Sequence, residues 1–261
     1  MSAPKPTGLT VAALAWREGA HLAKCFASLN PLLELTGAQT LIVLDGEADT
    51  STSESARRVA GTVLTRRFDN FARQRNFALD AVTTKWVFFI DADERMTPAL
   101  AVEIAALVRN GNDAAYRVPR RNILFGKEVR HTGWWPDHQV RLLQTARCRY
   151  DEAQGVHEVP HVQGSIGTLS NPLIHFNYET WRQFVAKQRS YAPLEARSLQ
   201  AAGQKARLRS FVGQPAREFK RRYIDYQGYK DGRLGLGLSL AMSAYKFLTY
   251  WHLYRLARRP R

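Results

Sequence analysis

Mostly apolar runs that end in acidic residues characterise the first half of the chain. They cover residues 9–14, 40–44 and 86–90, and the last two are followed directly by Asp45 and Asp91. A short apolar run without polar alternation predicts a strand that is buried on both faces, as in a parallel sheet. Since ligands of open α/β sheets bind at the carboxyl ends of the strands, we expect a site at this acidic edge.

Helical patterns alternate with these strands. We expect helices at residues 18–29, 53–59, 71–81 and 98–109, and a further short strand at residues 62–65. Strands that alternate with helices indicate an α/β fold with a doubly wound, mostly parallel sheet.

The pattern changes after about residue 110. Shorter apolar segments joined by polar loops predict strands near residues 115–120, 123–126, 139–143 and 167–170. From Glu179 onward the spacing is helical, at residues 180–201, 215–225 and 234–258. We therefore expect the chain to divide at about residues 115 and 178 and to end in a helical extension.

Composition and charge narrow the class of protein. The chain has 261 residues, of which 45% are hydrophobic, enough for a full core. Its formal charge is +15, but residues 1–115 carry 12 Lys/Arg against 13 Asp/Glu, so the basic excess lies in residues 116–261. Such a half can bind nucleic acid, anionic lipid or a phosphorylated substrate. Nucleic acid is disfavoured, because no zinc-finger spacing, RNP-like strand or leucine zipper accompanies the charge.

Cysteine usage and the N-terminus indicate a cytoplasmic protein. The two cysteines, Cys25 and Cys148, are far apart and form no C-x-x-C motif, which excludes a disulfide framework and a cysteine-rich metal site. No hydrophobic stretch of signal-peptide length precedes Trp16-Arg17-Glu18, so we expect no export.

The segment from Leu234 to Tyr254 has the length of a bilayer span, but it contains two glycines, Lys246 and His252. Its aromatic residues beside Lys246 and Arg255 suit a helix at the inner face of a membrane. A C-terminal helix that packs on the domain and ends in a solvated basic tip fits the same pattern.

Asp91 and Asp93 are the strongest candidates for chemistry. Two carboxylates one residue apart at a strand end can bind a hard divalent cation, Mg²⁺ or Mn²⁺, that in turn holds a diphosphate. The alternative is a surface turn before a helix that Asp93 or Thr97 caps, with Pro98 in its first turn.

A longer pattern surrounds this pair. The run Phe71-Ala-Arg-Gln-Arg-Asn-Phe-Ala-Leu-Asp80, then the strand, then Asp91-Ala-Asp93 resembles the R-N-x-G/A…D-A-D core of family 2 glycosyltransferases. The resemblance continues through Gly133-Trp-Trp-Pro-Asp137, Val156-His-Glu158 and Leu173-Ile-His175, over roughly residues 8 to 250. It extends to the bacterial subgroup that glucosylates the lipopolysaccharide inner core and related acceptors.

The resemblance implies a GT-A fold and transfer of a sugar from a nucleoside diphosphate, with a UDP-sugar as the first choice. It implies that residues 1–115 form the nucleotide-sugar-binding half and residues 116–178 the acceptor-binding half. Residues 179–261 are then the basic extension, which either lies on the membrane surface or packs on the domain. The acceptor is a lipopolysaccharide-core or lipid-linked saccharide.

The resemblance also assigns residues. It implies a nucleotide-sugar site formed by Glu18, Asp45, Arg75, Asn76 and Asp91, and a metal site formed by Asp93, Asp91 and His175. Two departures from the family pattern concern base recognition: Arg17 replaces the usual Asn before Glu18, and the loop from Asp45 to Asp49 is one residue shorter. A purely structural role is the alternative for three of these residues. Asp45 could stabilise a turn, Arg75 could lie on a solvated helix face and His175 could be a buried core residue.

The catalytic base must be a carboxylate that reaches the acceptor hydroxyl. Glu158 is the first choice, from its place along the chain, and Asp137 is the rival. One base and no carboxylate nucleophile imply a direct displacement that inverts the anomeric centre. Trp134, Trp135 and Arg141 are candidate acceptor contacts, although the tryptophans could equally fill the core.

Two other functions share some of these sequence features. A nucleotidyltransferase would share the sheet and the metal carboxylates, but residues 9–19 lack the Gly-rich, basic loop that it normally shows. A non-enzymatic basic module that binds anionic membrane or nucleic acid would leave the acids at the strand ends unexplained.

Overall fold

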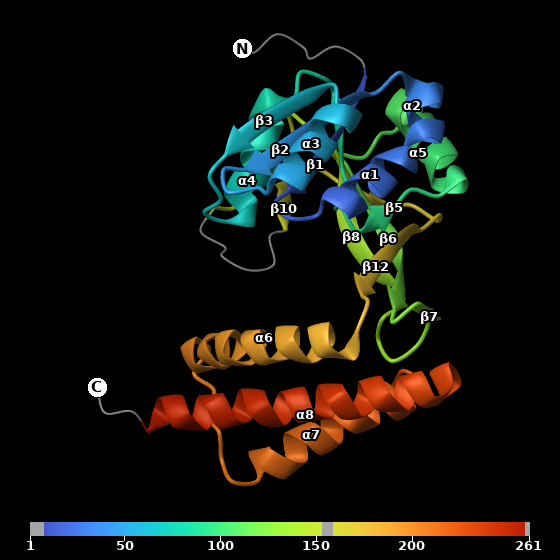
Figure 1. Cartoon of the computed structure of the whole chain (residues 1–261). Helices are drawn as coiled ribbons and strands as arrows, with labels where there is room; N and C mark the ends of the chain where they lie inside the picture. The colour runs from blue at the N-terminus through green and yellow to red at the C-terminus, as the bar shows by residue number, and fades with distance from the viewer. Residues whose placement is uncertain (1–7, 153–158, 259–261) are drawn as a thin grey trace. The chain divides into compact units, whose positions relative to one another are not determined.

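The computed structural model describes residues 8–152 and 159–258 (Figure 1). The chain forms two compact units, and neither is one continuous segment. The first unit is made of residues 1–120 and 137–175, and the second of residues 121–136 and 176–261. The chain therefore passes between the units at three points, two of which fall inside strands β6 (Ala115–Leu124) and β12 (Leu173–Tyr178).

Four parallel strands form the first half of the main sheet. They are β1 (Leu9–Ala15), β2 (Gln39–Asp45), β3 (Thr62–Arg66) and β4 (Trp86–Phe89). β1 pairs in parallel with both β2 and β4, and β2 pairs in parallel with β3. Every residue of β4 is buried, which explains its uninterrupted apolar sequence.

The rest of the sheet is mostly antiparallel. β8 (Asp137–Gln144) runs antiparallel to β4 and to β6, and β5 (Glu94–Arg95) runs antiparallel to β12. The sheet order is β3-β2-β1-β4-β8-β6-β12-β5. The predicted α/β sheet is confirmed, but it is mixed rather than mostly parallel, because no crossover helix separates β6 from β8 and short loops can join only antiparallel neighbours.

Four short strands complete the β structure. β7 (Lys127–Val129) and β11 (Ile166–Thr168) pair with β6, whereas β9 (Cys148–Tyr150) and β10 (Pro160–Val162) pair with each other in a separate two-stranded sheet.

Helices cover both faces of the parallel strands. They are α1 (Gly19–Ala27), α2 (Asn30–Thr36), α3 (Thr50–Val59), α4 (Phe71–Ala81) and α5 (Pro98–Asn110). One core joins α1, α2, α3 and α5 to one face of the sheet, and a second core joins α4 to the other face. The doubly wound arrangement predicted from the sequence is therefore present, and α2 is a separate helix that begins with Asn30 and Pro31.

Side-chain caps determine where several loops end. Asp49 accepts a hydrogen bond from the N–H of Thr52, Asn70 from that of Arg73 and Thr97 from that of Leu100. Of the two capping residues considered for α5, Thr97 is therefore the one used, which leaves Asp93 outside the helix.

The second unit consists mainly of helices. They are α6 (Trp181–Ala201), α7 (Ser210–Lys220), the π-helix η1 (Arg221–Asp225), the 3₁₀ helix η2 (Gly228–Asp231) and α8 (Gly232–Ala257). One core of this unit contains Leu124, Val129 and Phe184 with Leu238 of α8, and another contains Ala196, Tyr250 and Leu253. In the described part of the chain, no helix has the length and apolar content needed to cross a membrane.

Candidate active site

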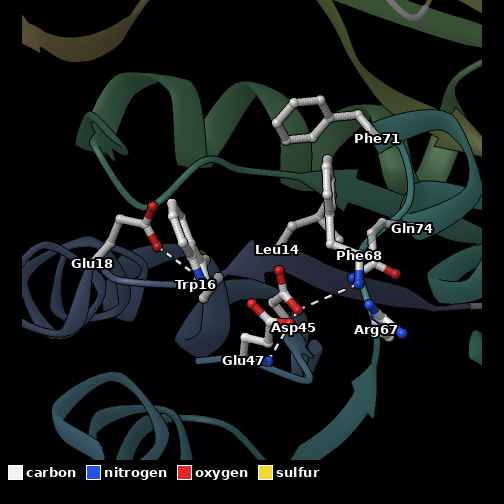
Figure 2. A pocket seen from close by; sticks show the side chains of 10 residues that line it. Leu14, Trp16, Glu18, Asp45, Glu47, Arg67, Phe68, Phe71 and Gln74 are labelled. Atoms are coloured by element: carbon white, nitrogen blue, oxygen red, sulfur yellow. Dashed lines mark hydrogen bonds between the residues drawn. The ribbon is translucent and has the colours of Figure 1, made fainter. Parts of the chain in front are cut away.

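A cavity of about 480 Å³ opens at the carboxyl ends of β1 and β2 (Figure 2). Three partly exposed aromatic side chains line it, those of Trp16, Phe68 and Phe71. The rings of Phe68 and Phe71 meet edge to face with centroids 4.9 Å apart. The remaining lining residues are Leu14, Ala15, Glu18, Asp45, Glu47, Arg67 and Gln74. Flat apolar walls with a few polar groups are typical of sites for planar ligands.

Asp45 supplies a carboxylate to this cavity from the end of β2. Its Oδ1 accepts the backbone N–H groups of Glu47 at 3.1 Å and Phe68 at 3.3 Å, which fixes the side chain. Its Oδ2 accepts no hydrogen bond from any residue that the structure describes. Figure 2 shows the carboxylate between the loop of Glu47 and the ring of Phe68. Asp45 can therefore receive one N–H or O–H donor from a ligand.

Glu18 closes the loop after β1. Its Oε2 accepts the backbone N–H groups of Trp16 at 2.7 Å and Arg17 at 2.8 Å. The Arg17 guanidinium lies over the Trp16 ring, 4.5 Å from its centroid. Glu18 thus positions the loop that carries Trp16, and Arg17, which replaces the usual Asn, supports the ring.

Asp91 follows the buried end of β4 and binds two arginines. Arg75 of α4 approaches its Oδ1 at 3.2 Å, and Arg141 of β8 donates to Oδ1 at 3.3 Å and also to Oδ2. Burial alone would raise the pKa of Asp91, but the charges of Arg141 and Arg75 outweigh it and hold the pKa well below its usual range. Asp91 is therefore ionised under all physiological conditions.

The ion pairs continue beneath Asp91. Glu94 is completely buried, and its Oε1 accepts Arg141 at 2.6 Å and Arg120 at 3.2 Å. Arg120 also donates twice to Oδ2 of Asp137, at 2.6 Å and 3.0 Å. Arg141 and Arg120 each bridge two carboxylates, so the buried charges of this ion-pair network are compensated by close opposite charges.

Asp93 lies next to His175 of β12. The Nε2 of His175 is 3.4 Å from Oδ2 of Asp93, whose side chain is 39% exposed, whereas that of His175 is 9% exposed. β12 pairs with β5 so that His175 lies opposite Glu94. Over residues 8–152 and 159–258, no three His, Cys, Asp or Glu side chains are close enough to hold a metal ion by themselves. A cation here would need further ligands from a substrate or from water.

Asn76 of α4 binds the backbone of β9. Its amide donates to the carbonyl oxygen of Tyr150 at 3.0 Å and to Glu152 at 2.9 Å, and its Oδ1 accepts the N–H of Tyr150 at 2.9 Å. The side chain is 2% exposed. The Asn76 amide thus fixes the edge of the two-stranded sheet to α4.

The structure thus has an acidic sheet edge beside an aromatic cavity. The comparison with protein families identifies the family to which a chain with these features belongs. The model of the family described as "Glycosyl transferase family 2" matches residues 10–162, more than half of the chain. The chain belongs to glycosyltransferase family 2. The mixed sheet between two helical layers is thus the GT-A type of fold, and the enzyme class inferred from the sequence is confirmed.

Relatives with curated names include glycosyltransferases from bacteria. This family 2 glycosyltransferase is 28% identical over 249 residues to the "Lipopolysaccharide core biosynthesis glycosyltransferase LpsC" of Rhizobium meliloti, with 91% of this chain and 88% of that protein covered. It is 21% identical over 199 residues to an uncharacterised glycosyltransferase of Rickettsia felis, with 72% and 69% covered.

Similar solved structures include S. aureus TarS 1–349 in complex with UDP-GlcNAc, at a TM-score of 0.49 and 13% identity, with 97% of this chain and 93% of that chain covered. The chain spans 56% of the longer TarS chain, at a TM-score of 0.47. Glucosyl-3-phosphoglycerate synthase of Mycobacterium tuberculosis, in complex with Mn²⁺, UDP-glucose and phosphoglyceric acid, aligns over 44% of each chain, at 17% identity and a TM-score of 0.39.

The structure places five of the predicted site residues of this glycosyltransferase in two separate groups. Glu18 and Asp45 line one cavity, while Arg75, Asp91 and Arg141 form one ion-pair cluster. The sequence predicts Arg141 as an acceptor contact, but its side chain is 5% exposed and bonded to Asp91 and Glu94.

The two predicted tryptophans differ in exposure. Trp134 is partly buried and packs against Tyr178, with ring centroids 6.4 Å apart. Trp135 is 39% exposed and lines a cavity of about 360 Å³ in the second unit together with Tyr226. Glu158, the first choice for the base, lies outside the described residues.

Several cavity residues are not predicted as site residues: Trp16, Glu47, Arg67, Phe68, Phe71 and Gln74. A usable signal exists for two of them, because Trp16 directly follows β1 and Phe68 lies in the short loop between β3 and Asn70, the cap of α4. Large aromatic residues at the carboxyl edge of a parallel sheet have little core to fill.

Proposed function

We propose that this glycosyltransferase moves a sugar from a UDP-sugar to a lipopolysaccharide-core or related lipid-linked saccharide, with inversion at the anomeric carbon. One observation carries the proposal: the ends of adjacent parallel strands present an aromatic cavity containing Asp45 and, beside it, the pair Asp91 and Asp93. A nucleoside and its diphosphate need these two environments in this order. The name of the Rhizobium relative supports the choice of acceptor.

The cavity after β1 and β2 receives the nucleoside. Trp16 and Phe68 offer ring faces or edges to the base, and Oδ2 of Asp45 accepts one ring N–H. A single acceptor matches uracil, which has one ring N–H between two carbonyl groups, whereas guanine would present two adjacent donors. A volume of about 480 Å³ lies within the usual range for ligand sites.

The diphosphate lies at Asp93. Oδ2 of Asp93 and Nε2 of His175 would hold Mn²⁺ or Mg²⁺ from the protein side, and the substrate and water would have to supply the other ligands. When bound, such a cation neutralises the charge that develops on the leaving diphosphate. Asp91 is less suitable as a ligand, because Arg75 and Arg141 already bind its oxygens.

Arg141 therefore acts as a positioning residue in this proposal. It fixes the direction of Asp91 from β8, while Arg75 fixes it from α4 and rests over the ring of Phe89, 5.1 Å from its centroid. A carboxylate held in this way can accept hydroxyl groups of the donor sugar without rotating.

The acceptor hydroxyl loses its proton to a carboxylate, for which Glu158 remains our proposal. Asp137 is the weaker candidate, because Arg120 donates twice to its Oδ2 and the side-chain amide of Gln139 donates to its Oδ1 at 3.0 Å. All three contacts are made with the charged carboxylate, so protonation of Asp137 would weaken them. The deprotonated oxygen then attacks the anomeric carbon, and the bond to the diphosphate oxygen breaks in the same step.

Trp135 is the better of the two tryptophans as an acceptor contact. With Tyr226, which is 45% exposed, it gives the second unit a cavity that combines two aromatic surfaces with Arg130, His131 and Asp225. Aromatic faces with flanking polar groups bind sugar rings by stacking and hydrogen bonding. Trp134, which packs against Tyr178, is proposed to support this segment from the core.

A thermal-shift panel tests the donor site. UDP, GDP and dTDP would be added with and without Mn²⁺ to the wild type, to Asp45→Asn, to Asp93→Asn and to the control Glu34→Gln, which changes an exposed carboxylate on α2. The expected result is Mn²⁺-dependent stabilisation by UDP that both site variants reduce and the control retains. Equal stabilisation of all four proteins would reject the assigned site.

Product formation tests the acceptor and the base. Sugar transfer from the UDP-sugar that the panel selects to purified lipopolysaccharide core would be measured for Glu158→Gln and Asp137→Asn. We expect a loss of at least about 100-fold in kcat for Glu158→Gln, the usual range for general-base catalysis, and a smaller loss for Asp137→Asn. The reverse order would transfer the role to Asp137.

A further inference from the structure

One long face of α8 carries apolar side chains that remain exposed. Leu236, Leu240, Phe247 and Trp251 are 39%, 54%, 46% and 44% exposed. At 100° per residue, their spacings place them within about 60° of one another on the helix, over a length of about 22 Å. Ser243 interrupts this stripe between Leu240 and Phe247 and donates to the carbonyl oxygen of Pro215 in α7. Scattered apolar side chains on a surface are normal, but a stripe of four on one helix face indicates a contact with an apolar phase.

α7 extends this stripe at the C-terminal end of α8. Phe211 packs against Phe247, Trp251 and Tyr254, with ring centroids 5.8, 6.1 and 5.6 Å apart. Leu208, in the turn before α7, and Val212, in its first turn, are 79% and 75% exposed. These two are the most exposed large hydrophobic residues in the described part of the chain.

Positive charge surrounds the same end of the unit. A hollow of about 770 Å³ is bordered by Lys205, Arg207, Arg209 and Arg217, together with Tyr250 of α8. None of the four cations forms an ion pair with a residue that the structure describes. Residues 196–217 contain five Lys/Arg and no Asp or Glu, and residues 176–261 contain 18 Lys/Arg against five Asp/Glu.

We propose that the turn Arg207-Leu208-Arg209, the first turn of α7 and the exposed face of α8 dock on the surface of an anionic lipid bilayer. Leu208 and Val212 would enter the headgroup boundary, Trp251 would lie at headgroup depth, and the four cations would face lipid phosphates. Charge complementarity selects this occupant, because an apolar face edged only by cations would repel a second copy of itself. The inference does not rest on the proposed reaction.

Vesicle sedimentation of the whole chain tests the proposal. Vesicles of phosphatidylcholine would be compared with vesicles that also contain phosphatidylglycerol, at low and high salt. The wild type is expected to bind only the anionic vesicles and to dissociate at high salt, because screening shortens the range of charge attraction. Binding to both kinds of vesicle alike, or to neither, would overturn the proposal.

Matched variants separate the two components of docking. For Arg207→Gln with Arg209→Gln, we expect binding about 25-fold weaker, since each cation near an anionic surface contributes about fivefold. Arg57→Gln with Arg109→Gln removes two exposed cations of the first unit and should bind like the wild type. Equal weakening in both double variants would indicate a response to net charge alone and would reject the assigned surface.

The apolar component has its own pair of variants. Leu208→Ser with Val212→Ser removes side chains that are mostly in solvent, so the fold should be unaffected, and we expect at least tenfold weaker binding. Val102→Ser, at an exposed position of α5, is the control. If the wild type instead sediments as a dimer that Leu208→Ser with Val212→Ser dissociates, and shows no vesicle binding, the face belongs to a second copy and the proposal is wrong.

Discussion

Arg141 binds both carboxylate oxygens of Asp91, although 50 residues separate the two along the chain. The pairing arises because β8 runs antiparallel to β4, which places its buried arginine beside Asp91, the second residue after β4. Asp91 is thus supported by a strand that reaches the site from the opposite direction.

Loss of this support should destabilise the fold. We expect Arg141→Met to lower the free energy of unfolding by about 3–5 kcal/mol, because the change leaves the buried Glu94 and Asp91 with less compensation. The control Arg149→Met breaks the exposed pair with Asp80 and should cost less than about 1 kcal/mol. Urea unfolding of the three proteins measures both values, and similar losses would contradict a buried network.

Nucleotide affinity should depend on Asp45. In Asp45→Asn, the remaining oxygen can still accept the N–H groups of Glu47 and Phe68, so the loop is retained. The charged acceptor for the base is lost, and we expect the Kd for UDP to rise by about 10-fold to 100-fold. Calorimetric titration measures it, with Glu34→Gln expected to match the wild type.

Two glycines of the second unit form a test of packing. Gly126 and Gly133 both have positive φ, +73° and +80°, but only at Gly133 would a Cβ atom meet another side chain, 2.7 Å from the ring of Tyr226. We expect Gly126→Ala to cost about 1–2 kcal/mol from backbone strain alone. Gly133→Ala should cost about 1–3 kcal/mol more through overpacking. Thermal unfolding distinguishes them, and equal costs would mean that Tyr226 moves aside freely.

Acid should weaken the hairpin of β6 and β7. The hydrogen bond from Arg121, followed by that from Arg130, lowers the pKa of Glu128 from 4.5 to about 2, against the opposing effect of burial. Because the pKa is lower in the folded state, its contribution to stability is complete above pH 4.5 and is lost as the pH falls toward 2. Glu128→Gln should therefore lose less stability than the wild type over this interval. Unfolding in urea at several acidic pH values measures the slopes, and parallel slopes would contradict the lowered pKa.

Both cysteines should be unreactive in the native protein. Cys25 and Cys148 are buried, and burial raises the pKa of Cys148 to about 11 and that of Cys25 further. Thiolate is the reactive form, so a thiol reagent at neutral pH should label them only after denaturation. Rapid labelling of one thiol in the native state would show that its core opens readily.

Local patterns predict much of the structure of residues 8–115. Continuous apolar strands, the helix at residues 71–81 and Thr97 before Pro98 each have a signal within a few residues. Asp45 and Asp91 are found because each directly follows a continuous apolar run of the sequence. Their surroundings depend on distant partners: no local feature reveals that Arg141 turns inward or that the N–H of Phe68 fixes Asp45.

The structure after about residue 116 is less predictable for a related reason. Trp134 and Trp135 are identical in type and adjacent, yet one packs on Tyr178 and the other lines a cavity with Tyr226. Which of them faces solvent depends on helices that begin more than 40 residues later in the chain. The same applies to Phe211, which packs against Phe247 of α8, whereas Leu208, three residues earlier, is left exposed.

The interleaved chain of the two units limits how this enzyme can be recombined. Residues 121–136 lie inside the first unit's sequence but contribute Leu124 and Val129 to a core completed by Phe184 and Leu238. A chimera that replaced only the C-terminal helices would therefore leave that segment facing a foreign surface. Exchange of the second unit between relatives needs three coordinated crossovers, one on each side of residues 121–136 and one near residue 176. The specificity of the enzyme is therefore expected to diverge by point substitution more readily than by shuffling.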